Sequence, residues 1–538
     1  MSRSRVNAQT GGFGTQSQRL GREGSEGSGE LFIVYPDQLW PPPKGYTLIL
    51  HETAEYYTKY KFHKQKLAYL RATSRIWAGK YGAEIKDAEW RPSGKVNIYE
   101  TEKPSILNVP TMLGPEVREI EYHANPGFIL SRADCLRIHG GKQTIPLRGD
   151  VQNEVSEKAF IWINDIKDEQ PEHVGGQTAM STPKNPRYKT TPEWIEARTW
   201  VFENFPSNPG EISEVPLYPL TASAATASFK YFLQWGLPHY AKYKEAIRTD
   251  NHVLYHSMLS VPMNVGLITP REVIEMTYSA YMNDPRLGAS AKEFLRQQIW
   301  REYMRIIAIA NPAVADTNFF DNNKRLGPGW YTAQTGCEIV DNTLRAVLAT
   351  GYCHHIERLM ILSAWMLMRG AHPKAAFIWF SEMFMDAYDW VMVGNVYAMG
   401  MWSCGRKYLT RPYFSSGAYF DEKSNYPRTA TEQWTRDGYD YFFAEKGKII
   451  ETRNLYVVGN LYARWKKTHL SEMTARITAQ STKVTPYTLD KPSDKSPDKS
   501  PDKSPDKTHK PSSKLTSTMK GKNNDNEEKK ELEIIPFN

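Results

Sequence analysis

The sequence predicts an α/β domain with a doubly wound sheet, followed by a large all-α domain. Two short apolar runs, Leu31–Tyr35 and Tyr46–Leu50, precede a long helical pattern near Ala54–Ala78, and this order of strands and helix is typical of a doubly wound sheet. From about Pro219 a helical period dominates for roughly 250 residues, which predicts helices alone. At 538 residues and 40% hydrophobic content, the chain can build two or three domains.

Changes in composition divide the chain into five expected segments. Residues 1–30 are rich in Gly, Ser and Arg and should be a disordered tail. We expect the α/β domain at 31–168, an interdomain linker at 169–215 and the all-α domain at 216–478. Residues 479–538 form a low-complexity tail with a Ser-Pro-Asp-Lys repeat. Asp cancels Lys in that repeat, so we interpret it as a solvated tether.

Charge and cysteine content limit the partners and the compartment. The net charge of +8 mildly favours a polyanionic partner. The four cysteines, at positions 135, 337, 353 and 404, form no Cys-x-x-Cys pair. We therefore expect an intracellular, reducing compartment, which could be the nucleus, the cytoplasm or a virion. The apolar run Met360–Met368 is too short to span a membrane, and we expect a monomer with no membrane partner.

The predicted α/β domain has a candidate ligand crevice. In open parallel sheets, ligands bind beyond the carboxyl ends of the strands, which places Asp37, Gln38 and Glu52 at such a site. A structural domain with no ligand is an equally good interpretation. His63 and Lys66, at the start of the long helix, could as well lie on its solvated face.

Two consecutive helices, buried on almost every face, are predicted in the second domain. Residues 356–368 and 374–385 are largely apolar, Gly370 supplies a stop, and Pro373 supplies a start. A buried charge persists only when it is paired. We therefore expect Arg358 to pair with Asp386 or Asp389, either as a structural ion pair or as part of a cofactor site.

Two further blocks carry polar groups with binding chemistry. In residues 255–260, YHSMLS, hydroxyls, a histidine and backbone amides near a helix start suit a diphosphate, although such residues also cap helices. In residues 293–305, Gln297, Trp300, Arg301 and Arg305 share one or two helix faces. Aromatic surface, amide and positive charge together suit a flipped base and its phosphates, with a helix of i,i+4 ion pairs as the alternative.

These blocks resemble the photolyase/cryptochrome superfamily. The patterns TGY-x-HHIERLM and FMDAYDWVMV-x-NVY, together with FIVYPDQL and WREY, are similar to its iron–sulfur bacterial cryptochrome and photolyase branch, the photolyase-related proteins. The resemblance covers roughly residues 31–475. It implies FAD in the all-α domain, UV-damaged DNA as partner, and a lumazine- or pterin-type antenna at the crevice of Asp37, Gln38 and Glu52.

The resemblance also implies individual roles. FAD contacts are expected from Tyr243, His256, Ser257, Met258, Leu259, Ser260, Arg358, Asp386, Ala387, Tyr388, Asp389 and Asn395. The lesion pocket would contain His354, His355, Trp300 and Tyr413, with His355 as proton donor, and DNA would meet Gln297, Arg301 and Arg305. Aromatic steps through Trp330, Tyr331 and Tyr388 would reduce the flavin.

The chain departs from this branch at the metal. The branch holds a [4Fe–4S] cluster on four cysteines, but the matching positions carry Ile339, Pro427 and Ala430, and no cysteine follows before Tyr439. We predict no cluster.

The function predicted from the sequence is therefore that of an FAD-dependent DNA photolyase. Such an enzyme uses blue light to repair pyrimidine dimers by passing an electron to a flipped-out lesion. The resemblance favours (6-4) photoproducts and leaves cyclobutane dimers open. The alternatives are a cryptochrome-like photosensor without repair activity and a DNA-associated structural protein that retains only the fold.

Overall fold

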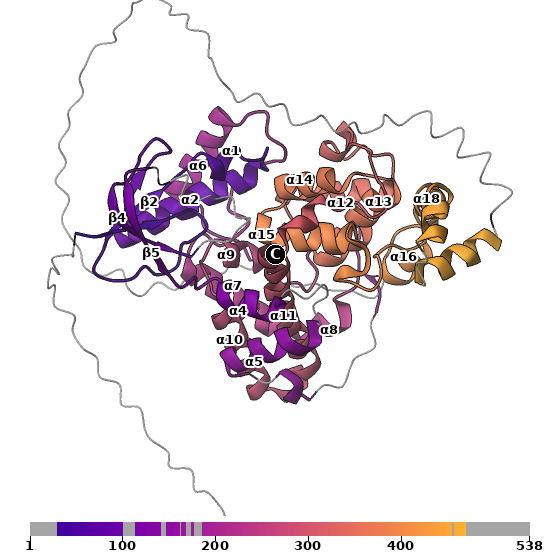
Figure 1. Ribbon diagram of the computed structural model, residues 1–538, viewed down its shortest axis with the longest axis horizontal. Helices are drawn as coiled ribbons and strands as arrows, with labels where there is room; N and C mark the ends of the chain where they lie inside the picture. Colours follow the sequence, from indigo (N-terminus) through magenta and orange to yellow (C-terminus); the bar gives the residue numbers. More distant parts are fainter. Residues whose placement is uncertain are drawn as a thin grey trace, which may run out of the picture.

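The computed structural model describes residues 29–100, 113, 115–140, 147–161, 163–167, 174–176, 186–453, 457–467 and 469. Almost all of both predicted tails therefore lies outside the described residues. Figure 1 shows the sheet at one side, helices around α11 in the middle and below, and the last helices at the opposite side. Within the described part of the chain, no helix is both long and apolar enough to cross a membrane.

The predicted parallel sheet is confirmed. Five strands run in the order β3-β2-β1-β4-β5, and every neighbouring pair is parallel. The strands are β1 Leu31–Val34, β2 Thr47–His51, β3 Glu84–Lys86, β4 Gly94–Tyr99 and β5 Val117–His123. Phe32, Ile33 and Val34 of the central strand are fully buried, as expected for a strand covered on both faces.

The long helix predicted after the second strand is observed as α2, Lys64–Tyr81, with the short α1, Glu55–Thr58, before it. His63 caps α2 through Nδ1, which accepts from the Gln65 amide at 3.1 Å, while Nε2 lies 3.0 Å from the carbonyl oxygens of Val347 and Leu348. His63 and Lys66 are both fully buried. The start of α2 is therefore a contact with the helical domain and not a solvated face.

Part of the expected linker is a helix. Residues 192–204 form α6, Pro192–Asn204, capped by Thr191, whose hydroxyl accepts from the Trp194 amide. Trp194 is fully buried, and Trp200 packs edge-on against Tyr57 of α1. This helix packs along α2 beside the sheet (Figure 1).

The end of the α/β part also differs from the expected boundary at residue 168. Helices α4, Arg132–His139, and α5, Gln152–Ala159, pack on α11 and α10 and not on the sheet. Figure 1 shows them below the sheet, among the later helices. The Glu302 carboxylate of α11 accepts from the amides of Ile129 and Leu130, which fixes this segment to the helical part.

The rest of the described chain is helical, as the sequence predicts. Helix α11, Gly288–Ala310, is the longest, with 23 residues, and lies at its centre (Figure 1). Before it come α7 Ala222–Trp235, α8 Leu237–Tyr243, α9 Ser260–Asn264 and α10 Pro270–Asn283; after it come α12 Glu338–Thr350, η7 Glu357–Ser363, α13 Ala364–Met368, α14 Pro373–Met383, α15 Asp389–Met392, η8 Val393–Gly400, α16 Ala418–Lys423, α17 Arg428–Trp434, η10 Thr435–Asp440 and α18 Tyr441–Thr452.

The two predicted buried helices are observed as η7 with α13 and as α14. Gly370, between them, has φ +80°, the left-handed conformation that ends a helix, and Pro373 begins α14. The η7 segment is a π-helix, a form found often at functional sites. These helices form a second hydrophobic core, separate from the one around the sheet and α11.

Candidate functional site

A cavity of about 270 Å³ lies where the two hydrophobic cores meet. Its walls come from the loop before α9, one face of α11, the start of η7, and the segment from α14 to η8. Aromatic side chains form much of its surface, namely Tyr240, Phe294, Trp300, Tyr352, Phe380 and Trp390. Mostly apolar walls with a few convergent polar groups are typical of a site for an organic ligand.

Arg358 and Asp386 form the predicted ion pair on the cavity wall. Nη1 of Arg358 lies 2.8 Å from Oδ1 of Asp386, and Nε donates to the Cys353 carbonyl at 2.8 Å. Burial raises the pKa of Asp386, but the adjacent guanidinium more than offsets this and lowers it overall. Both groups are therefore charged at neutral pH. The pair joins the first turn of η7 to the end of the loop after α14.

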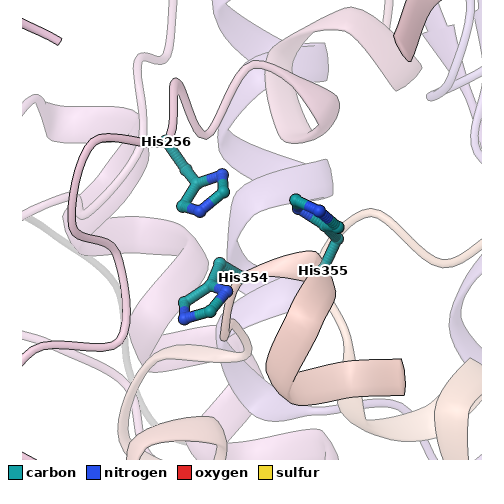
Figure 2. A group of neighbouring side chains, drawn as sticks. All are labelled: His256, His354 and His355. Atoms are coloured by element: carbon teal, nitrogen blue, oxygen red, sulfur yellow. The ribbon is translucent and has the colours of Figure 1, made fainter. Parts of the chain in front are cut away.

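Three histidines form one corner of the site. His256 comes from the loop before α9, and His354 and His355 precede η7 (Figure 2). The rings of His256 and His354 stack with centroids 4.7 Å apart and an interplanar angle of 6°, while His355 is edge-on to His256 at 5.1 Å. His256 and His355 line the cavity. His354 is fully buried behind them.

Burial controls the charge of these imidazoles. It is the largest cause that lowers the pKa of His355 to about 4, and Lys244 and Arg358 lower it further. The pKa values of His256 and His354 are also well below the usual value, first because of burial and then because of neighbouring positive groups. The fully buried His354 is therefore neutral at pH 7, whereas the side chain of His355 is exposed to solvent.

The three ring nitrogens lie within 4.8 Å of one another, which raises the question of a metal ion. An imidazole binds a metal in its own ring plane. Because the rings of His256 and His354 are nearly parallel, their lone pairs cannot meet at one ion without rotation of a ring. The arrangement does not fit a metal site.

Residues 256–260, which are predicted to contact FAD, line the cavity. His256, Ser257, Met258, Leu259 and Ser260 face it together. Two hydroxyl groups and the amides that lead into α9 offer hydrogen-bond donors to a negatively charged group. Asn395 of η8 lines the opposite wall and donates to the Val391 carbonyl at 2.9 Å.

Of the four α11 residues predicted to share a binding face, three line the cavity and one does not. Gln297, Trp300 and Arg301 line the cavity. Arg305 does not: its side chain is 1% exposed, with its guanidinium 3.8 Å from the Phe128 ring centroid. Arg305 also donates to the Leu130 carbonyl and lies 3.8 Å from the Glu302 carboxylate. The prediction that Arg305 contacts DNA is wrong because the folded chain buries it.

Several residues predicted to contact the cofactor lie outside the cavity wall. Tyr243 stacks on Tyr255, with ring centroids 5.0 Å apart, and does not line the cavity. The residue of α8 that lines the cavity is Tyr240. Ala387, Tyr388 and Asp389 meet the first domain: the Ala387 carbonyl accepts from Lys66, Lys66 lies 4.8 Å from the Tyr388 ring centroid, and Asp389 accepts from Tyr60 at 3.0 Å. These three residues hold the two domains together.

Of the remaining residues predicted for electron transfer and for the lesion pocket, only Trp330 is connected to the cavity wall through packed aromatic rings. Trp330 packs edge-on against Trp379 at 5.4 Å, and Trp379 packs against Phe380 of the cavity wall at 5.1 Å. Tyr331 donates to Glu382 at 2.6 Å, away from this series of rings. Tyr413 is half-buried against the second core, away from the cavity wall.

The predicted crevice residues bind partners within the first domain. Asp37 accepts from the Tyr56 hydroxyl, and Glu52 accepts from Tyr57 at 3.2 Å and from Arg75 at 3.2 Å. Burial raises the pKa of Asp37 to about 6, although the bond from Tyr56 opposes this. Gln38 is buried in the turn after β1 and accepts from the Tyr35 amide.

Sequence reasoning missed much of the cavity wall. The additional lining residues include Tyr240, Phe294, Gln298, Met304, Tyr352, Phe380, Trp390 and Met392. Most are apolar residues whose spacing fits an ordinary helix core, so no local signal separates them from packing residues. Trp390 is an exception, because it adjoins Asp389 in the quoted pattern, and Arg301 lies 4.7 Å from its ring.

Comparisons with known proteins identify relatives of this chain. A family model described as the FAD binding domain of DNA photolyase matches residues 294–438. The chain is 32% identical over 444 residues to a (6-4) photolyase of Agrobacterium fabrum, covering 74% of this chain and 86% of that protein. It is 24% identical over 224 residues to a deoxyribodipyrimidine photo-lyase of Salmonella typhimurium, covering 39% of this chain and 42% of the relative.

Two solved structures resemble the fold more distantly. One is a bacterial class III photolyase from Agrobacterium tumefaciens, with a TM-score of 0.46 and 13% identity over 85% of this chain and 99% of that one. The other is a Synechocystis cryptochrome, with a TM-score of 0.47 and 12% identity over 77% of this chain and 87% of that one.

Proposed function

This chain belongs to the photolyase/cryptochrome superfamily, and from that premise we propose that it is an FAD-dependent DNA photolyase whose substrate is the (6-4) photoproduct. The observation that carries this proposal is that His355 and the Arg358–Asp386 pair face the same cavity. One cavity therefore offers a proton donor and a charged anchor side by side. UV-damaged DNA is the partner that this function requires.

The donor groups of the cavity fit FAD. Aromatic and apolar walls suit a planar ring system, and Ser257, Ser260 and nearby backbone amides suit a diphosphate. Arg358 adds positive charge that Asp386 holds in place. When bound, FAD supplies light absorption and the transfer of one electron. The chain itself binds, orients and shields the cofactor.

His355 has the position and the chemistry of the proton donor. A (6-4) photoproduct carries a transferred hydroxyl or amino group, so its reversal needs a proton as well as an electron. His355 lines the cavity, is exposed to solvent there, and is edge-on to His256 and not stacked on it. A proton held at its ring nitrogen could reach the lesion and return after bond cleavage. Trp300, on the α11 wall, offers a surface on which a flipped base could stack.

The decisive experiment uses purified protein that contains FAD. Oligonucleotides with one defined (6-4) photoproduct or one cyclobutane dimer are illuminated with blue light, with dark samples as controls, and the remaining lesion is measured by mass spectrometry. We expect light-dependent repair of the (6-4) photoproduct. Bound flavin without repair of either lesion would indicate a photosensor. Repair of the cyclobutane dimer alone would show that the proposed substrate is wrong. Absence of flavin would refute the proposal as a whole.

The role of His355 is tested in the same assay. His355→Ala should lower the rate of (6-4) repair by about 10²–10⁴-fold, the usual contribution of a positioned acid. Any cyclobutane repair should fall only through weaker binding. The flavin content of the variant is measured in parallel. Unchanged (6-4) repair at full flavin content would remove His355 from the mechanism.

We also propose that the chain carries no iron–sulfur cluster at the positions that hold one in the iron–sulfur branch of the superfamily. Ile339 and Ala430 are buried apolar residues, and Pro427 precedes α17. Burial raises the pKa of the nearby Cys337 to about 12, which keeps it a thiol. Iron analysis should give far less than one atom per chain, and four atoms per chain would contradict this.

We propose no antenna site at Asp37, Gln38 and Glu52. Tyr56, Tyr57 and Arg75 already use the carboxylates of this group. Pigment release on denaturation, followed by chromatography, should therefore give FAD and no lumazine or pterin.

A further inference from the structure

The contact between the α/β domain and the helical domain contains a buried lysine. Lys66 lies in the first turn of α2, and its side chain is fully buried. Its ammonium group donates to the Ala387 carbonyl and lies 4.6 Å from the ring centroid of Phe62 and 4.8 Å from that of Tyr388. A methionine would fill the same space without the cost of burying a charge. A charge persists at such a position only where it offsets other charges.

Three carboxylates lie near enough to Lys66 to stabilise its charge, one from the first domain and two from the loop after α14. The two carboxylates of the loop have direct cationic partners. Asp386 pairs with Arg358 at 2.8 Å, and Asp389 pairs with Lys59 at 2.5 Å. These two negative charges are therefore already compensated.

The third carboxylate, that of Asp37, has a different environment. It accepts from the hydroxyl group of Tyr56, which is neutral. Burial raises the pKa of Asp37 to about 6, and the positive charge of Lys66 opposes this rise. Lys66 is therefore the cation that offsets Asp37, and with Lys66 charged the three carboxylates are matched by three cations.

The segment that Lys66 contacts also forms part of the cavity wall. Asp386 lines the cavity, and its backbone carbonyl accepts from Nδ2 of Asn264 at 2.9 Å. Oδ1 of Asn264 accepts in turn from Arg301 at 3.1 Å, and both of these side chains line the cavity. The next residue, Ala387, is the one bonded to Lys66. One short segment therefore meets the cavity on one side and the buried lysine on the other.

Resting on the FAD site proposed above, we propose that Lys66 is a positioning residue whose charge holds residues 386–389 in the form that retains FAD. Without this charge, one carboxylate near Asp386 and Arg358 is uncompensated, which weakens the attraction of the cavity for a diphosphate. None of the residues that line the cavity comes from the sheet or α2. The α/β domain would thus contribute to cofactor binding through Lys66, from outside the cavity.

The charge of Lys66 can be removed by pH as well as by mutation. Burial lowers the pKa of Lys66 to about 8, although Asp386, Asp389 and Asp37 oppose this. Lys66 is therefore charged at pH 7 and loses its charge as the pH rises through about 8. An anionic cofactor favours the charged form, so the loss moves to somewhat higher pH when FAD is bound.

The neighbouring titratable groups have pKa values outside the window from pH 7 to pH 9.5. Burial raises the pKa of Tyr56 and that of Tyr388 well above the usual value. Burial also brings the pKa of Asp37 to about 6 and that of His63 to about 4, and the pKa of Asp386 lies below its usual value. A change in FAD retention within this window would therefore report the charge of the lysine.

The test follows the release of FAD from purified, FAD-containing protein at pH values from 7 to 9.5, through the fluorescence of the released flavin. Lys66→Met keeps the length of the side chain and removes its charge. The double variant Lys66→Met with Asp37→Asn also removes the uncompensated carboxylate. The matched control is Lys64→Met, at a half-buried lysine in the same turn of α2. Urea unfolding of each protein measures stability in parallel.

At pH 7, Lys66→Met should release FAD at least about tenfold faster than the wild type. The double variant should regain most of this loss, because its charges are again balanced. The release rate of the wild type should rise between pH 7 and pH 9.5, whereas that of Lys66→Met should stay constant. Lys64→Met should follow the wild type at every pH.

A wild-type release rate in Lys66→Met at pH 7 would overturn the proposal, as would an equal effect of Lys64→Met. Failure of a folded double variant to regain FAD retention would show that the charge is not what Lys66 supplies, and would overturn it too. If Lys66→Met does not fold or contains no FAD, the wild-type profile decides: a rising release rate supports the proposal, and a constant rate overturns it. A wild type without FAD would refute the proposed function instead.

Discussion

Nη1 of Arg358 lies between the two carboxylate oxygens of Asp386, 2.8 Å from Oδ1 and 3.1 Å from Oδ2. The side chains are 18% and 6% exposed. Removal of one partner from such a buried pair leaves the other charge without compensation, which is more costly than replacement of both. The pair therefore links the stability of the helical domain to the shape of the cavity.

Asp386→Asn should lower the free energy of unfolding by about 3–5 kcal/mol and reduce the amount of bound flavin. Urea unfolding and the visible absorption of the purified protein measure the two effects. The matched control is Glu432→Gln, which breaks the exposed Arg428–Glu432 pair at 3.1 Å and should change stability by no more than about 0.5 kcal/mol. Equal effects of the two substitutions would show that Arg358 is not held by Asp386.

Arg305 gives a second prediction, because it is buried and not at a DNA surface. Arg305→Met removes the cation beside Glu302 and should destabilise the protein by about 3–5 kcal/mol. The salt dependence of DNA binding by the folded protein should not change, since no phosphate contact is lost. Arg286→Leu, at an arginine that is 89% exposed, is the control for stability.

The opposite result for Arg305→Met would be informative. A DNA contact would reduce the slope of log affinity against log salt by about one, with little loss of stability. Fluorescence anisotropy with undamaged duplex DNA at several salt concentrations measures that slope. Such a result would mean that Arg305 leaves its buried position when DNA binds.

The sequence predicted the parts of this protein that depend on local pattern. The strands at β1 and β2, the buried helices and the Arg358–Asp386 pair follow from periodicity and from the need to pair a buried charge. The resemblance assigned His256 and Asn395 to FAD and His355 to the lesion pocket, and all three line the same cavity.

Contacts between distant segments could not be predicted in this way. Arg305 and Arg301 are four residues apart on α11, but only Arg301 reaches the cavity, because residues 128–130 cover the next turn. Tyr388 belongs to the quoted pattern FMDAYDWVMV, yet Lys66 from the first domain lies against its ring. Helix α6 was missed because its short apolar stripe is paired with α2, far away in the sequence. Each error concerns which partner covers a helix face, which periodicity does not specify.

A third prediction concerns pH. Burial is the main cause that lowers the pKa of His63 to about 4, although the Leu348 and Val347 carbonyls oppose this. In the unfolded chain a histidine binds its proton near pH 6.5. Between pH 6.5 and 4 the unfolded state therefore holds the extra proton, so stability must fall as pH falls through this window. The contribution of His63 is about 3 kcal/mol across the window.

His63→Asn should therefore flatten the dependence of unfolding free energy on pH between 6.5 and 4, relative to the wild type. Other buried histidines, such as His51, remain in both proteins, so the difference between the two curves isolates His63. Urea unfolding at several pH values gives these curves. Parallel curves for His63→Asn and the wild type would show that His63 is not held neutral at the domain contact.

The last prediction concerns electron supply to the cavity. Trp379 is fully buried, its Nε1 donates to the Trp330 carbonyl at 3.1 Å, and its ring packs between Trp330 and Phe380. Phe380 lines the cavity, so Trp379 is the ring that connects Trp330 to the site.

Trp379→Phe keeps most of the packing and loses one hydrogen bond worth about 1 kcal/mol. It should slow the light-driven reduction of bound flavin by an external thiol by an order of magnitude or more, as followed by the loss of flavin absorption. Trp365→Phe is the matched control, because Trp365 is a buried tryptophan of the same core that packs on Trp434 at 4.9 Å, away from the cavity. Tyr388→Phe should also leave the rate unchanged, since Tyr388 lies at the domain contact. A fast reaction in Trp379→Phe, or an equal loss in Trp365→Phe, would exclude the route through Trp330 and Trp379.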